Sequence, residues 1–71
     1  MSKFYVVSLY SGCAFVGYLA STNGQYHVTT LENADLYTMV LFAETEAAKF
    51  KVDCPQYNTL VNTVTVELND E

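Results

Sequence analysis

Two runs of aromatic and β-branched residues open the chain and predict a β-hairpin. They are residues 3–11 (KFYVVSLYS) and 14–21 (AFVGYLAS), and Ser11-Gly12 breaks the pattern between them. Such residues favour strands, and a glycine between two runs of this kind favours a turn. The number of turn residues decides which face of each strand points inward, and the pattern leaves that number open.

An Asn23-Gly24 pair predicts a second hairpin, which leads into a third strand over residues 25–30. This dipeptide accommodates the positive φ angles of a two-residue type I′ turn. The turn then fixes the pairing as Thr22 with Gln25, Ser21 with Tyr26, Ala20 with His27, Leu19 with Val28 and Tyr18 with Thr29. One face carries Phe15, Leu19, Tyr26 and Val28, and the other carries Val16, Tyr18 and His27.

The middle of the chain carries apolar residues at a helical period, namely Leu36, Met39 or Val40, Ala43, Ala47, Phe50 and Cys54. Two starts compete. Either Asn33 caps a helix that begins at Ala34, or residues 37–42 (YTMVLF) form a strand and the helix is confined to residues 44–52. We favour the helix over residues 44–52. Asp53-Cys54-Pro55 ends the helix, because a proline disfavours helical backbone in the residue before it.

After a loop over residues 55–59, the final run predicts a half-buried strand over residues 60–68 (LVNTVTVEL). Its two sides carry Leu60, Val64, Val66 and Leu68, and Thr63, Thr65 and Glu67. The order is therefore β-β-β-α-β. We expect an α+β fold in one domain over residues 1–71, with a small antiparallel sheet of three N-terminal strands plus the C-terminal strand and one helix packed on one face.

Composition adds an expectation of association. The chain has 71 residues, 51% of them hydrophobic, with six Tyr and four Phe, so it folds but has only a small core. Two Cys and one His are one ligand short of a zinc site with four thiolate or imidazole ligands, so we expect no metal and no cofactor.

One helix covers one face of the sheet and leaves the other face open. We expect a homodimer or higher oligomer joined through that face, because soluble monomers rarely expose large apolar patches. The alternative is that the open tyrosines are solvated through their hydroxyls. The candidate interface residues are Tyr5, Val7, Val16, Tyr18 and His27.

Charge indicates the kind of partner. The chain has eight acidic residues, three Lys and no Arg, for a net charge of −5, and the 28 positions between Lys3 and Glu32 carry no charge. Phosphate and base recognition depends on Arg and Lys, so we expect no direct nucleic-acid binding and a protein partner with a basic surface. Carboxylates clustered like phosphates indicate DNA mimicry, and an even scatter indicates a solubilising role. The candidate acidic surface is Glu44, Glu46, Asp53, Glu67 and Asp70.

The uncharged stretch over residues 4–20 is 17 residues long, at the lower limit for a membrane span. Its Ser, Gly, Val and Tyr content favours strands, so we expect no membrane association. The run Ser11-Gly12-Cys13 matches a lipoprotein cleavage box only in part, since Tyr10 replaces an aliphatic residue. We expect a cytoplasmic protein with reduced cysteines.

Residues suited to catalysis are few. His27, Cys13 and Cys54 are the only candidates for a nucleophile and base, and nothing in the sequence indicates that they meet. Glu44 and Glu46 are two apart on a helix and point in different directions, so they form no carboxylate pair. We expect no enzyme and no catalytic residue.

In size, acidity, absence of Arg and element order, the chain resembles the small acidic accessory proteins of tailed bacteriophages. The resemblance rests on a hairpin opening followed by LFAETEAAKF and NTVTVEL. It implies an inhibitor or adaptor that acts on a host defence, transcription or DNA-processing protein in the host cytoplasm. The alternatives are a self-assembling structural module, joined through its N-terminal sheet, and an enzyme or small-ligand protein built around His27.

Overall fold

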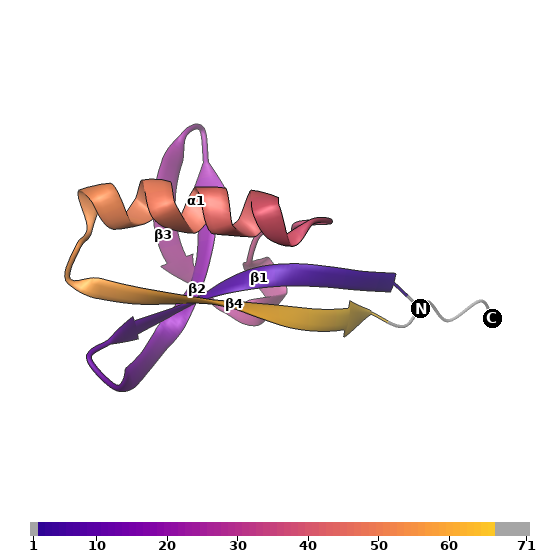
Figure 1. Ribbon diagram of the computed structural model, residues 1–71, viewed down its shortest axis with the longest axis horizontal. Helices are drawn as coiled ribbons and strands as arrows, with labels where there is room; N and C mark the ends of the chain where they lie inside the picture. Colours follow the sequence, from indigo (N-terminus) through magenta and orange to yellow (C-terminus); the bar gives the residue numbers. More distant parts are fainter. Residues whose placement is uncertain (1, 67–71) are drawn as a thin grey trace.

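Four strands form one antiparallel sheet in the order β3-β2-β1-β4, and helix α1 lies along one side of it (Figure 1). The computed structural model describes residues 2–66. The elements are β1 (Ser2–Ser11), β2 (Ala14–Thr22), β3 (Gln25–Thr29), a 3-10 turn η1 (Leu31–Asn33), α1 (Val40–Asp53) and β4 (Tyr57–Val66). The expected α+β fold and its β-β-β-α-β order are confirmed.

The Asn-Gly hairpin has the register that the sequence predicts. Asn23 and Gly24 have φ angles of 53° and 79°, as a type I′ turn requires. All five predicted pairs are present, from Thr22 with Gln25 at the turn to Tyr18 with Thr29 at the far end.

The first hairpin contains a β-bulge that changes the faces of β2. Gly12 and Cys13 form its turn, between the paired residues Ser11 and Ala14. Leu9 then pairs with Gly17 but Tyr10 pairs with Phe15, so Val16 is the extra residue. Because one inserted residue reverses the alternation, Phe15 lies on the face of Tyr18. The predicted grouping of Phe15 with Leu19 is therefore wrong.

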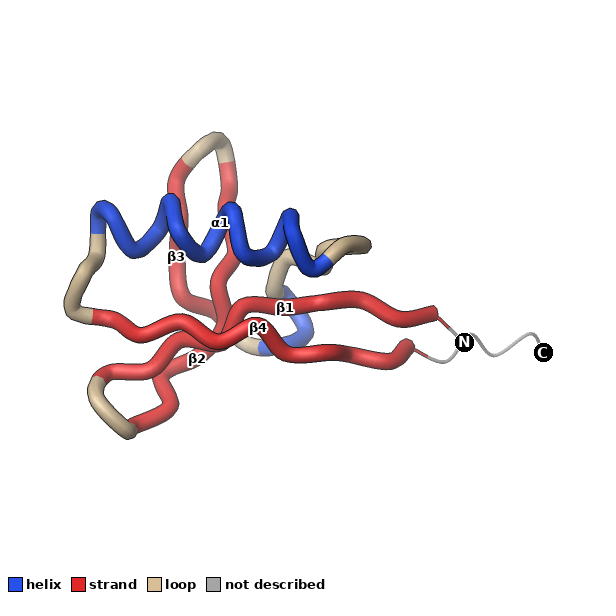
Figure 2. The backbone as a smooth tube through the Cα atoms, viewed as in Figure 1, coloured by secondary structure: helices blue, strands red, loops and turns tan. Residues whose placement is uncertain are grey.

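Neither predicted helix start is correct. Residues 34–39, which connect η1 to α1, form backbone hydrogen bonds with β1 and β2 instead of a helix. Tyr37 forms an isolated antiparallel bridge with Tyr5, and the two residues exchange N–H···O=C bonds of 2.8 Å. The backbone N–H of Asp35 also donates to the carbonyl oxygen of Leu19, at 3.3 Å. This segment thus satisfies backbone groups where β1 and β2 diverge (Figure 2), and α1 begins only at Val40.

At its other end, α1 extends to Asp53, and the backbone N–H of Cys54 donates to the carbonyl oxygen of Phe50 at 2.9 Å. A short turn at residues 54–56 follows, so β4 begins at Tyr57, earlier than the predicted loop and strand placed it. The last two residues of the predicted strand, Glu67 and Leu68, lie outside the described residues.

The core lies between α1 and the sheet. Its buried members are Val7, Leu9 and Leu19 from the strands and Ala43, Ala47 and Phe50 from the helix. The ring of Phe50 contacts that of Tyr26 edge to face, with centroids 5.9 Å apart. The predicted helical stripe is thus correct at its centre, whereas Leu36, Met39 and Val40 are exposed.

A second, smaller buried region lies on the opposite side of the sheet. Val6, Ser8 and Ala20 alternate with the core residues and are nevertheless buried. Strand β3 pairs with one edge of β2, and Asp35 bonds to the other edge. The segment between them, which contains η1, therefore crosses β2, and it does so on the side away from α1. The Ser8 hydroxyl donates to Oδ1 of Asn62, which satisfies this buried polar group.

Candidate functional site

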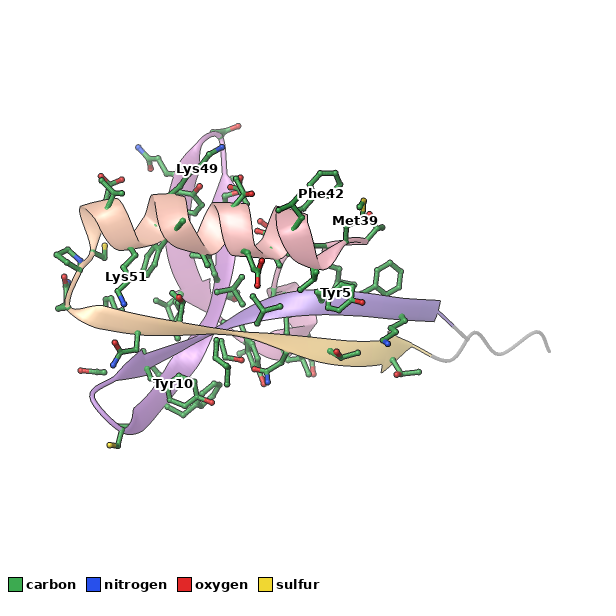
Figure 3. All side chains as sticks on the ribbon, viewed as in Figure 1. Tyr5, Tyr10, Met39, Phe42, Lys49 and Lys51 are labelled. Atoms are coloured by element: carbon green, nitrogen blue, oxygen red, sulfur yellow. The ribbon has the colours of Figure 1, made fainter. Side chains whose placement is uncertain are left out.

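The side of the sheet turned away from α1 carries large apolar residues, and we call them the outer face. The register places them there, because each shares its side of the sheet with Ser8 or Val6 rather than with the core residues Val7 and Leu9. The outer face consists of Phe4, Tyr10, Phe15, Tyr18, Leu60 and Val64. Figure 3 shows Tyr10 projecting from this side.

Three aromatic rings pack together at the centre of the outer face. The ring of Phe15 meets those of Tyr10 and Tyr18 edge to face, with centroids 5.6 and 5.2 Å apart. Phe15 is nevertheless 53% exposed, and Leu60, across Ser8 from Tyr18, is 51% exposed. The cluster is therefore held in place by its own contacts while much of its area meets water.

The predicted interface residues do not form one surface. Tyr18 and His27 lie on the side away from α1, and Val16, the bulge residue, is 41% exposed. Val7 is fully buried in the core, and Tyr5 packs against the core on the same side. The reason is the register: Ser8 pairs with Tyr18, so Tyr18 shares its side with the even-numbered residues of β1.

Of the six outer-face residues, only Tyr18 is among the predicted interface residues. The other five are Phe4, Tyr10, Phe15, Leu60 and Val64. Gly17 carries the signal that would have placed Phe15, because a glycine inside a strand often marks a bulge or a close approach. A Cβ at Gly17 would lie 2.6 Å from Cγ1 of Val28. The apolar side of β4 was recognised, but the sequence did not show that it points away from the helix.

The predicted acidic surface is dispersed over the described part of the chain. Glu46 accepts a hydrogen bond of 2.7 Å from the Tyr26 hydroxyl and forms an ion pair of 3.3 Å with Lys49. Asp53 is seven residues further along α1 and faces the same way, whereas Glu44 faces β4. Glu67 and Asp70 lie outside the described residues. Within residues 2–66 the carboxylates thus form no single row.

The contact of Tyr26 with Glu46 also shifts both pKa values. The hydrogen bond from the Tyr26 hydroxyl lowers the pKa of Glu46, and with burial it raises the pKa of Tyr26 to about 12. Glu46 is therefore held in its ionised form by contacts inside the fold, where it joins α1 to β3.

An open groove of about 580 Å³ lies between α1 and β4. Val40, Glu44, Ala47, Ala48 and Lys51 form its helical side. Its other side consists of Tyr5 and residues of β4, namely Thr59, Val61 and Thr63, which face α1, and Leu60, which borders the groove although the register places its side chain on the outer face. Lys51 points from the helix toward β4 in Figure 3. The groove exists because the alanines at its centre leave space that longer side chains would fill.

A second exposed apolar patch lies at the start of α1. Met39, Leu41 and Phe42 are each more than half exposed, and Met39 and Phe42 point away from the sheet in Figure 3. This patch has no aromatic packing comparable to that of the outer face among the described residues.

The residues suited to catalysis lie on separate elements. Cys13 is exposed in the first turn, His27 is exposed on β3 and Cys54 caps the end of α1. Within residues 2–66, no three His, Cys, Asp or Glu side chains gather as metal ligands would. In the same range, none of the helices has the length and apolar character needed to cross a bilayer.

Comparison of the chain with protein-family models, with curated proteins and with solved structures gives no match. The function is therefore inferred from the geometry of the chain itself.

Proposed function

We propose that the chain is a non-enzymatic protein-binding module that docks through its outer face. The observation that carries this proposal is the packed but exposed cluster of Tyr10, Phe15 and Tyr18. Aromatic side chains are enriched in protein interfaces, and their burial supplies large contact areas with few rotatable bonds. A ring already held by its neighbours loses little entropy on binding.

The partner that fits this surface has an apolar cleft bordered by basic residues. The chain carries a net charge of −5 and no Arg, and Glu32 belongs to η1, the segment that crosses β2 on the outer side of the sheet. Acidic groups near an apolar centre steer a basic protein toward it and disfavour a nucleic acid. Because the described carboxylates are dispersed, aromatic contacts rather than phosphate mimicry carry the affinity. The resemblance to small phage proteins supports an inhibitor or adaptor of a host protein as the biological role.

The test compares two exposed phenylalanines in capture experiments. Phe15 and Phe42 are 53% and 51% exposed, the first on the outer face and the second at the start of α1. We expect tagged Phe15→Lys to lose a host protein that the native chain captures, because the lysine places a charge in the docking centre. Phe42→Lys retains that protein.

Two outcomes would contradict the proposal. Loss of the captured protein with Phe42→Lys alone moves the docking surface to the start of α1. The second outcome is that Phe15→Lys lowers the oligomeric mass of the protein in solution and has no effect on capture. This would indicate that the outer face joins copies of this chain instead.

A further inference from the structure

Strand β4 is a long edge strand without the usual protection. It lies at one end of the sheet and spans Tyr57–Val66, and its pairing with β1 contains no irregularity over the described residues. Natural edge strands are commonly short, bulged, charged or interrupted by proline, because an open edge pairs with other strands. The sequence of β4, YNTLVNTVTV, has neither a charged residue nor a proline.

The register shows which backbone groups of β4 point to the open edge. Tyr5 exchanges both of its backbone hydrogen bonds with Tyr37, on the edge of β1 away from β4. Its partner on β4 is Thr63, so these two residues form a pair without hydrogen bonds between them. The direction of the backbone N–H and C=O groups alternates from one residue to the next along a strand. Those of Thr59, Val61 and Thr63 therefore point away from β1, to the open edge of the sheet.

The helical side of the neighbouring groove is self-complementary. Glu44 and Lys51 lie seven residues apart on the side of α1 that faces the groove, and Ala47 and Ala48 lie midway between them. Both charged side chains are exposed, and the only ion pair among residues 2–66 joins Lys49 and Glu46. A second α1 placed antiparallel beside the first brings each Glu44 opposite the Lys51 of the other copy, with alanines at the crossing.

We propose that two copies of the chain associate through β4 and the groove beside it. The two β4 strands pair antiparallel about a two-fold axis at Val61, so that Thr59 of each copy faces Thr63 of the other. The axis passes through the centre of the groove, where Val61 lies opposite Ala47 and Ala48. The strand contributes hydrogen bonds, and the Glu44 and Lys51 pairs fix the antiparallel direction.

This interface adjoins the outer face along β4, but it is formed by the open strand edge and the groove and does not require the cluster of Tyr10, Phe15 and Tyr18. The two sheets continue into each other, so both helices lie on one side and both outer faces on the other. A dimer of this kind presents two docking surfaces side by side, with Leu60 of each copy close to the junction. A partner with two sites would then be bound more tightly through avidity.

The first experiment measures the mass in solution by sedimentation at tens of micromolar. We expect two chains for the native protein and one chain for Val61→Pro, because proline removes an outward N–H group and blocks the edge. Val28→Pro is the matched control, since Val28 pairs with Leu19, whose carbonyl points away from β3. The N–H group of Val28 therefore points outward from β3, the other edge strand. We expect Val28→Pro to keep the mass of two chains.

The second experiment uses charge reversal and requires no change in the strand. Glu44→Lys and Lys51→Glu each place like charges together twice per dimer, and we expect a dissociation constant about tenfold higher. The double variant restores the native value, because the pairs re-form with opposite polarity.

Three results would overturn the proposal. They are a native mass of one chain, a dimer that persists in Val61→Pro, and charge reversals that do not restore association when combined. A dimer split by Tyr18→Lys but not by Val61→Pro moves the association to the outer face.

Discussion

At the scale of single residues, Tyr26 joins β3 to α1 through its hydroxyl and its ring. The hydroxyl donates to Glu46 at 2.7 Å, and the ring packs on Phe50. Tyr26→Phe keeps the ring and removes the hydrogen bond, so we expect a loss of about 1 kcal/mol in the free energy of unfolding at pH 7. Urea denaturation of both proteins measures this difference.

The pH dependence of this loss follows from the shifted pKa values. The pKa of Glu46 lies below its ordinary value of 4.5, so its contribution to stability is present above pH 4.5 and disappears as pH falls through the lowered pKa. The pKa of Tyr26 rises from 10.0 to about 12, so its contribution is full below pH 10 and disappears as pH rises through 12. Native and Tyr26→Phe proteins therefore differ most between about pH 5 and 10. An equal difference at every pH would contradict this assignment.

Gly17 provides the second residue-scale prediction, because its hydrogen faces the neighbouring strand. A Cβ at this position would lie 2.6 Å from Cγ1 of Val28 and 3.0 Å from the carbonyl oxygen of Thr29. The Val28 side chain can turn aside, but the backbone oxygen cannot move without disturbing β3. We expect Gly17→Ala to lower the free energy of unfolding by about 1–3 kcal/mol, measured by urea denaturation. Ala14→Gly controls for general effects of glycine and alanine in β2.

At the scale of elements, the connection between η1 and α1 is fixed by few contacts. Oδ2 of Asp35 accepts hydrogen bonds from the backbone N–H and the hydroxyl of Ser21, at 2.9 and 3.1 Å. The bridge between Tyr5 and Tyr37 follows directly. Asp35→Ala removes the first anchor, so we expect faster hydrogen exchange at the Tyr5 and Tyr37 amides while the Asn-Gly hairpin keeps its protection.

The stability of Asp35→Ala decreases by about 1 kcal/mol, since one exposed carboxylate with two bonds is lost. Asp53→Ala is the control, because it removes a carboxylate of the same charge that lies at the end of α1. Equal exchange rates at Tyr37 in the native protein and Asp35→Ala would show that the bridge with Tyr5 is sufficient alone.

The elements also show how far local sequence determines this fold. The Asn-Gly turn and the pairing of β2 with β3 depend on backbone preferences of two adjacent residues, and both were predictable. The start of α1 depends on Tyr37 reaching Tyr5, more than thirty residues earlier, so local periodicity placed it wrongly. The bulge at Val16 made the predicted outer face wrong as well. One inserted residue moves Phe15 to the side of the sheet opposite Leu19.

At the scale of the whole molecule, net charge makes the two proposed associations respond to salt in opposite directions. Each chain carries −5, so two copies repel at long range, whereas a basic partner is attracted. Raising the ionic strength from about 0.01 to 0.1 M shortens the screening length from about 30 to 10 Å. The repulsion between the bodies of two chains is then largely screened, while Glu44 and Lys51 in contact across the dimer are affected much less.

We therefore expect the dimer to become tighter over this range of salt and the complex with a captured partner protein to become weaker. Sedimentation of the free chain measures the dissociation constant of the dimer. Titration of the monomeric variant Val61→Pro with the purified partner protein measures that of the complex. The sign of each change identifies the force: apolar burial in the outer face is insensitive to this range of salt, so a falling affinity reports the acidic surround. A dimer that weakens between the two salt concentrations would show that the Glu44 and Lys51 pairs outweigh the net repulsion. An affinity for the partner protein that does not change with salt would remove the basic surface from the proposal and leave the aromatic cluster as the only determinant of binding.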